Sequence, residues 1–265
     1  MAEQSGRRTR DAFTIRKILA CFGPSTLATG AIESAVDLAA RLAAELETLF
    51  VEDTAVLQLT ELPFVRELTL PGLQALPLSR RNLELQCRVL AREAEGRLAE
   101  IAASRRLRWS FRIARGRILA EAAAGAARSD LLALGFRTRP IARESRLDPS
   151  VQSLIGAVSA TILLLRPECP PGHPVYVVIE TASEADKLIA AAAAIADPRP
   201  RGPVATVWAA GHSLERQLAD RVAAAHVMGL RSLPAPEEIE DLMGPVAGGT
   251  LVLSASSMLL RLESW

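Results

Sequence analysis

The stretch KILACFGPSTLATGAIESAVDLAARLAAELETLFVED, Lys17 to Asp53, decides the fold class. It opens with a short apolar run that ends in glycine, which is typical of a buried parallel strand. Apolar side chains then recur at alternating spacings of four and three, as on one face of a helix: Ile32, Val36, Ala39, Ala43 and Leu46. A second strand-like run, ETLFVED, follows. Strand, helix and strand predict a βαβ unit with a right-handed crossover, and therefore an α/β fold.

The same rhythm continues to about Pro167. We expect an irregular excursion with short helical turns from Thr54 to Arg81, where prolines and a glycine interrupt a leucine-rich segment. Its leucines indicate that it packs on another surface, as a lid or an interface would. A long helix is expected from Asn82 to Ser104, followed by the strand LRWSFRIARG. The alternation of apolar and polar residues in that strand predicts the edge of a sheet.

The segment ECPPGHP has the composition of a linker, and a shorter α/β pattern restarts beyond it with VYVVIE. We expect its first helix to begin at Ser183 in a capping box with Asp186. The chain is thus divided into a disordered start over residues 1–15, an α/β domain over 16–168 and a second, shortened α/β domain over 174–265. Parallel sheets are expected in both domains.

Composition limits the classes of function. The hydrophobic share of 49% in 265 residues is enough for a sizeable core, and the net charge of +1 excludes a chain that is basic throughout. Three widely spaced cysteines without a C-x-x-C pair indicate neither a disulfide framework nor a zinc knuckle. No signal peptide and no membrane-spanning run is visible, so we expect a cytoplasmic protein without a membrane partner.

The first half resembles the universal stress protein family, from Arg16 to about Pro167. The resemblance lies in KILACFGPS, AVDLAARLAAELETLFVED, REAEGRLAEIA, ARGRILAEAAAGAARSDLLALG and SVQSLIGAVSATILLLRP, in the family's order. It implies Rossmann-like units related to the adenine nucleotide alpha hydrolases, with the sheet order 3-2-1-4-5. The second copy looks like the family's tandem arrangement, in which it stands in for the second subunit of a dimer.

The resemblance also implies a nucleotide site, which this sequence has partly lost. ATP-binding members carry an acidic residue after the first strand, where Gly23 stands here. Their phosphate motif has three glycines and a hydroxyl residue after the fourth strand; Gly135 matches the first glycine, but Thr138 and Asp148 replace the others. The candidate nucleotide-binding residues are Phe22, Gly23, Val51, Gly116, Gly135, Arg137, Arg139, Ser150 and Val151.

The loop GFRTRPIARESRLDPSV, Gly135 to Val151, leaves two interpretations open. Its arginines maintain solubility on an exposed loop, or Arg137 and Arg139 bind an anion together with the helix N-terminus at Ser150. Ser150 also fits a plain N-cap, and Gly116 a plain turn glycine. Cys21, inside an apolar strand, fits a small core residue better than a reactive thiol.

Three hypotheses follow. The first is a regulatory or interaction protein of the stress response that binds ATP, ADP or AMP weakly or not at all, with an unknown protein partner and with homo-oligomers open. The second is a nucleotide-binding module that uses arginines in place of glycines. The third, an enzyme such as a slow nucleotide hydrolase, is the least favoured, because no Ser, His and acid arrangement and no metal-ligand spacing is visible. Nucleic acid is not expected as a partner, because aromatic residues for base stacking are missing.

Overall fold

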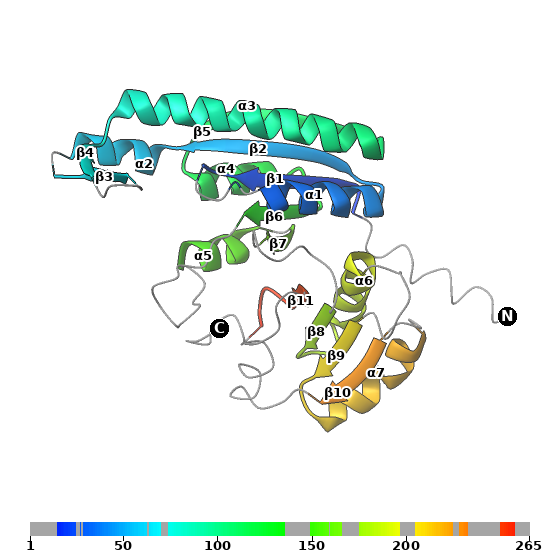
Figure 1. Ribbon diagram of the computed structural model, residues 1–265. Coiled ribbons are helices and arrows are strands. Elements are labelled where there is room, and N and C mark those ends of the chain that lie inside the picture. The colour runs from blue at the N-terminus through cyan, green and yellow to red at the C-terminus, as the bar shows by residue number, and fades with distance from the viewer. Residues whose placement is uncertain are drawn as a thin grey trace. The chain divides into compact units, whose positions relative to one another are not determined.

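The computed structural model describes residues 15–24, 27, 29–62, 64–69, 74–135, 149–158, 160–165, 175–196, 205–224, 228–232 and 250–257. The chain divides into two compact units. The N-terminal unit comprises Arg16–Arg137 and Val158–Pro167, and the C-terminal unit comprises the other residues (Figure 1). The domain boundaries expected from the sequence stay a prediction, and the segment expected to be disordered lies outside the described residues except for buried Ile15.

The N-terminal unit is built on a five-stranded parallel sheet of order β5-β2-β1-β6-β7. Its strands are β1 (Lys17–Phe22), β2 (Glu45–Asp53), β5 (Trp109–Gly116), β6 (Leu131–Gly135) and β7 (Thr161–Leu165). Numbered along the chain, this is the expected order 3-2-1-4-5. β1 lies at the centre and is almost wholly buried, which explains its apolar run, whereas β5 is the predicted edge strand.

Helices cover both faces of this sheet. α1 (Thr29–Leu42) contacts α3 (Arg80–Arg105), and a cluster of Phe50, Cys87 and Ala91 joins β2 to α3. α4 (Ile118–Ala126) contacts β1, β2, β5 and β6. It lies so close to β1 that a Cβ atom at Gly125 would come within 2.4 Å of Leu19 Cδ2. The alternation of side chains along a strand therefore sends Leu19 toward α4 and Phe50 toward α3.

α1 is shorter than the apolar spacing predicts. It ends at Leu42, and Ala43 adopts a left-handed conformation with φ of 51°. Ala44 N donates to Ala39 O at 2.9 Å, which closes the helix end, and Leu46 already belongs to β2. The prediction that one helical face extends to Leu46 is therefore wrong for the last turn.

The excursion between β2 and α3 contains more regular structure than expected. α2 (Thr54–Gln58) is capped by Asp53, whose Oδ1 accepts from Ala55 N at 2.9 Å. A single 3₁₀ turn, η1 (Leu59–Glu61), follows, and β3 (Arg66–Thr69) pairs with β4 (Gln74–Pro77) in an antiparallel hairpin. The short helical turns are confirmed. The hairpin was not predicted, because prolines in this segment argue against strands.

The C-terminal unit contains a four-stranded parallel sheet of order β10-β9-β8-β11. Numbered along the chain this order is 3-2-1-4, so the sheet is a shortened copy of the first. Its strands are β8 (Val175–Ile179), β9 (Ala205–Ala209), β10 (Met228–Ser232) and β11 (Thr250–Val252). α6 (Ala185–Ile195) and α7 (His212–Ala224) share one apolar core with the strands, and α5 (Pro149–Ala157) groups with this unit.

The start of α6 corrects the expected capping box. The N-cap is Glu184, which makes no side-chain cap, and the Ser183 hydroxyl contacts Thr181 Oγ1 at 3.2 Å instead. In the part of the chain that the structure describes, no helix is both long and apolar enough to cross a membrane.

Candidate functional site

The strands of the N-terminal sheet end together at one edge, which we call the strand-end edge. Five candidate residues lie there: Phe22, Gly23, Val51, Gly116 and Gly135. Asp53 pairs with Gly116, and Cys21 pairs with Leu134, one residue before Phe22 and Gly135. Ligands of open α/β sheets bind at this edge, where the strand order reverses. The expected grouping of these five residues is therefore present.

The other candidates lie outside the described residues or outside this unit. Arg137 and Arg139 lie outside the described residues. Ser150 and Val151 belong to α5, of which only the backbone is described at these positions, and α5 is part of the other unit. Phe22 and Val51 bury their side chains in the core, so only their backbone can face a ligand.

Gly116 lies beside the side chain of Glu121. A Cβ atom there would lie 2.7 Å from Oε1 of Glu121, a residue in the first turn of α4. The helix dipole stabilises a carboxylate in that turn, so the carboxylate lies next to Gly116 at this edge. Glu121 also acts on its surroundings: burial raises the pKa of the Cys21 thiol to about 12, and the Glu121 carboxylate adds to that rise. Both interpretations of Gly116, a plain turn glycine and a nucleotide contact, stay predictions.

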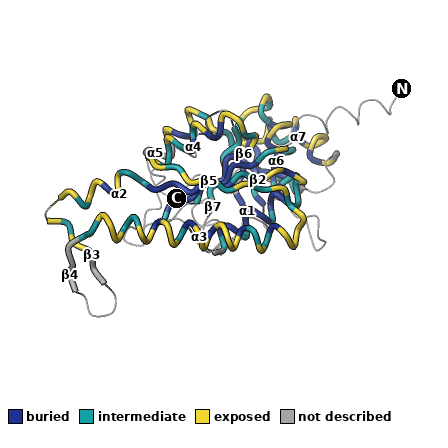
Figure 2. The backbone as a smooth tube through the Cα atoms, turned by 90° about the horizontal axis from the view of Figure 1, so that it is seen from above, coloured by how far each residue is buried: buried dark blue, intermediate teal, exposed yellow. Residues whose placement is uncertain are grey.

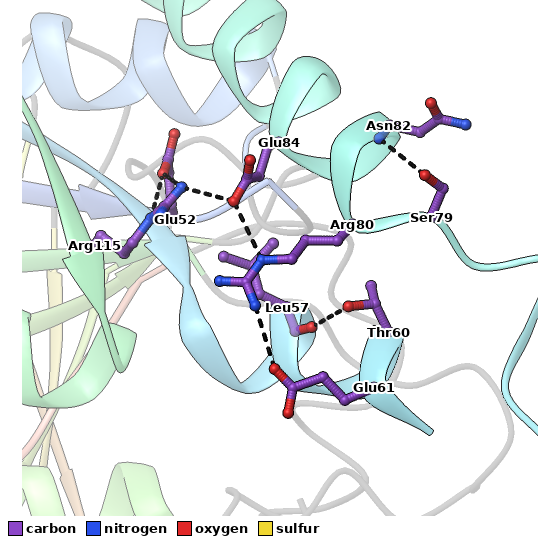
Figure 3. Close-up of polar contacts among 9 residues, drawn as sticks. All are labelled: Glu52, Leu57, Thr60, Glu61, Ser79, Arg80, Asn82, Glu84 and Arg115. Atoms are coloured by element: carbon purple, nitrogen blue, oxygen red, sulfur yellow. Dashed lines mark hydrogen bonds and ion pairs between the residues drawn. The ribbon is translucent and has the colours of Figure 1, made fainter. Parts of the chain in front are cut away.

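A ladder of alternating charges runs from this edge to the excursion (Figure 3). Arg115 Nη2 lies 2.9 Å from Glu52 Oε2 and 3.2 Å from Glu84 Oε1. Arg80 then contacts Glu84 at 3.4 Å and Glu61 at 3.2 Å. Glu52 is only 9% exposed, so its charge needs this partner. We call these five residues the charge ladder.

The charge ladder decides what Arg115 can do. Its guanidinium is shared by two carboxylates, so it is not available to a phosphate group. Arg117 is the neighbouring cation; it is exposed and makes no ion pair with any described residue. Glu52, Glu84 and Glu121 meanwhile bring negative charge to the same region. Charges of both signs therefore lie along the described part of the edge.

The matching edge of the C-terminal unit is rich in hydroxyl groups. Glu184 accepts from Ser254 Oγ at 2.5 Å, from Thr181 Oγ1 at 3.1 Å and from Ser256 Oγ at 3.3 Å. These bonds, led by that of Ser254, lower the pKa of Glu184. Ser257 donates to Glu180 Oε1 at 3.2 Å beside them. The cluster ties the segment after β11 to the segment after β8, and hydrogen bonding within the cluster accounts for it.

A serine, a histidine and an acid do meet in this unit, which the sequence did not reveal. Ser232 Oγ donates to Glu215 Oε2 at 2.6 Å, and His212 Nδ1 lies 3.0 Å from Ser232 Oγ and 3.1 Å from Glu215 Oε2. These contacts, led by the Ser232 hydroxyl, lower the pKa of Glu215. A catalytic relay uses both ring nitrogens, one toward the serine and one toward the acid. Here both contacts fall on Nδ1, so the cluster has no relay geometry.

The fold can be compared with those of known proteins. No family model and no curated protein matches the chain. A universal stress protein from Archaeoglobus fulgidus matches its structure with a TM-score of 0.59 at 11% identity, covering 93% of this chain and 91% of that chain. The fold is that of the universal stress proteins. At this identity the likeness establishes the fold alone.

Shorter structures with this fold also match part of the chain. The universal stress protein of Lactobacillus plantarum is 17% identical over 58% of this chain and 99% of its own, with a TM-score of 0.38. One from Burkholderia pseudomallei is 19% identical over 57% and 96%, with a TM-score of 0.35.

The charge ladder of this universal stress protein fold was not predicted from the sequence. A signal was available, because VED and ARG each place a charged residue at the end of an expected strand. The signs of Glu52 and Arg115 are opposite, and neighbouring strands bring them together. Among the described residues, no three side chains of His, Cys, Asp or Glu lie close enough to hold a metal ion.

Proposed function

We propose that this protein is a regulatory or interaction protein of the stress response, with the universal stress protein fold in tandem, in which the N-terminal unit has lost tight adenine-nucleotide binding. The Glu121 carboxylate beside Gly116 carries the proposal. It lies next to a glycine at the strand-end edge and brings a negative charge there, which repels a phosphate group. Gly23 at the end of β1 offers no carboxylate to a nucleoside, which supports the same conclusion.

A weak anion site is compatible with this function. The arginines at positions 137 and 139 and the start of α5 are the groups proposed to keep it. A few charge-assisted contacts of about 1.5–3 kcal/mol each, reduced by salt and by loop ordering, give an affinity nearer millimolar than micromolar. The protein is proposed to bind rather than to transform such a ligand.

Isothermal titration with ATP, ADP and AMP at physiological salt tests the proposal. We expect Kd values for wild type above about 100 µM. Glu121→Gln, which removes the charge beside Gly116, should tighten ATP binding several-fold, whereas Glu100→Gln on α3 should not. Micromolar ATP binding that survives Arg137→Ala together with Arg139→Ala would contradict the proposal. Micromolar binding that these two changes abolish would favour the nucleotide-binding module, and turnover of the nucleotide would favour an enzyme.

A further inference from the structure

The outer face of α3 exposes apolar side chains. The helix buries Cys87, Ala91, Ala94, Leu98 and Ala102 against its own unit. On the opposite side Leu85 is 60% exposed and Val89 is 47% exposed. Figure 2 shows exposed positions recurring along the whole length of α3. These two side chains lie one turn apart and form one apolar patch in the N-terminal half of the helix.

Small residues continue the same stripe into the C-terminal half of α3. Gly96, Ala99 and Ala103 follow Val89 at helical spacing, and Gly96 and Ala103 are exposed. Nothing lies within 4 Å of a Cβ atom built on Gly96. Glycine in a helix interior costs about 1 kcal/mol relative to alanine, and no contact with a described residue explains it here. A helix surface that is bare at this point allows another backbone to approach closely.

The charges along this stripe are separated in the same way. Three exposed arginines of the N-terminal half make no ion pair with a described residue, and neither do three exposed glutamates of the C-terminal half. They are Arg81, Arg88, Arg92, Glu93, Glu95 and Glu100. The arginines that face the unit itself are paired: Arg97 with Glu33 at 2.6 Å and Arg105 with Asp37 at 2.8 Å. The exposed stripe therefore has a basic half with large apolar residues and an acidic half with small ones.

We propose that this stripe is a self-association surface, on which the α3 helices of two copies of the chain pack antiparallel about a two-fold axis. An isologous contact must be complementary to itself. Antiparallel packing meets this requirement, because Leu85 and Val89 of each copy face the small residues of the other. It also sets Arg88 beside Glu95 of the partner subunit, on the same edge of both stripes, with the two copies of Arg92 between these two pairs at the two-fold axis.

A second copy fits the stripe better than two other occupants. An acidic helix from another protein would satisfy the arginines but would bring like charges against Glu93 and Glu95. An anionic membrane surface would meet the same repulsion, and two exposed aliphatic residues give it little apolar area to bury. The inference does not depend on the proposed function.

Sedimentation velocity of the full chain over a concentration series tests the surface. We expect a dimer for wild type within about 1–100 µM. Leu85→Gln with Val89→Gln should weaken it at least tenfold, and so should Gly96→Leu, which has free space in the single chain but blocks close approach. Leu59→Gln, at a leucine of η1 that is 42% exposed, is the matched control and should leave the dimer unchanged. Circular dichroism verifies that each variant is folded.

A charge exchange tests the antiparallel direction. Arg88→Glu should weaken the dimer about tenfold by facing Glu95 of the partner subunit, and adding Glu95→Arg should restore it. Leu85→Cys with Ala99→Cys should form an intermolecular disulfide on oxidation, and Leu85→Cys alone should not. A chain that stays monomeric to about 100 µM would overturn the proposal, as would a dimer insensitive to Gly96→Leu and Arg88→Glu. Binding of a monomer to anionic vesicles or to an acidic helical peptide would assign the surface to that occupant instead.

Discussion

Arg115 at the end of β5 holds the carboxylate of Glu52 at the end of β2, with Nε donating at 3.0 Å and Nη2 at 2.9 Å to the same oxygen. The two residues are neighbours only because β2 and β5 are adjacent in the sheet. Glu52 is nearly buried, so its charge depends on this pair. Arg115 also contacts Glu84 on α3, and it thereby joins the end of the sheet to that helix.

Removing this cation should destabilise the N-terminal unit. Arg115→Ala leaves the Glu52 carboxylate in a nearly buried place without its partner, and we expect a loss of about 1–2 kcal/mol in the free energy of unfolding, at the lower end because Arg115 is half exposed. Arg112→Ala on the same strand is the control, since its partner Glu47 keeps Lys17. Urea unfolding measures both, and equal losses would contradict a special role of the ladder.

Protonation of Glu47 should lower the free energy of unfolding as the pH falls. The hydrogen bond from Lys17, at 2.8 Å, is the main cause that lowers the pKa of Glu47 below its ordinary value of 4.5. A carboxyl with a lowered pKa stabilises the folded state above the ordinary value, and that contribution is lost as the pH falls through the folded-state pKa. Urea unfolding between about pH 6 and about pH 3 should therefore show a shallower pH dependence for Glu47→Gln than for wild type.

Two helical glycines should respond oppositely to alanine. In Gly125→Ala the new methyl group meets Leu19 Cδ2, a side chain fully buried under α4, and we expect a loss of about 1 kcal/mol and a drop in Tm of about 2–4 °C. Gly96→Ala meets nothing and should gain up to about 1 kcal/mol from helix propensity. Thermal unfolding at low protein concentration, where self-association does not contribute, distinguishes them. A gain for Gly125→Ala would show that Leu19 has room to move.

Cys21 and Cys87 should resist alkylation while the chain is folded. Both are buried, and burial is the main cause that raises the pKa of each thiol. The thiolate is the reactive form, so iodoacetamide at about pH 8 should label both cysteines only after denaturation. Peptide mass spectrometry of native and denatured samples provides the measurement. Rapid labelling of native Cys21 would contradict its place in the core of β1.

The central strands of the two sheets could be predicted because they are buried on both faces, whereas the edge strand β5 showed itself by alternation. β6 and β8 consist almost entirely of apolar residues, because both of their faces are covered. Such short apolar runs can be recognised as strands in the sequence alone. Helix periodicity was less reliable at the end of α1. The spacing from Ile32 to Leu46 fits a helix, but the left-handed conformation of Ala43 ends the helix earlier. The spacing of apolar residues does not reveal such a conformation.

The side-chain clusters could not be predicted, because strand neighbours and loop returns create them. Glu52, Glu84 and Arg115 are far apart in sequence and meet through the order of the sheet. Ser232 reaches His212 and Glu215 only because β10 lies beside β9. Ser183 satisfies every local requirement of an N-cap, yet its hydroxyl contacts Thr181 while Glu184, the actual N-cap, binds Ser254.

The central place of β1 has a consequence for synthesis on the ribosome. β1 is made early and can pair at once with β2, where Ile18 lies beside Leu46, but its other neighbour is β6, where Ile18 lies beside Leu131. Until the nascent chain has passed Leu134, one hydrogen-bonding edge of a strand that is apolar from Ile18 to Phe22 has no native partner. An unpaired edge of this kind invites pairing with other chains. Translation products that stop before β6 should therefore aggregate, and those that extend past β7 should not.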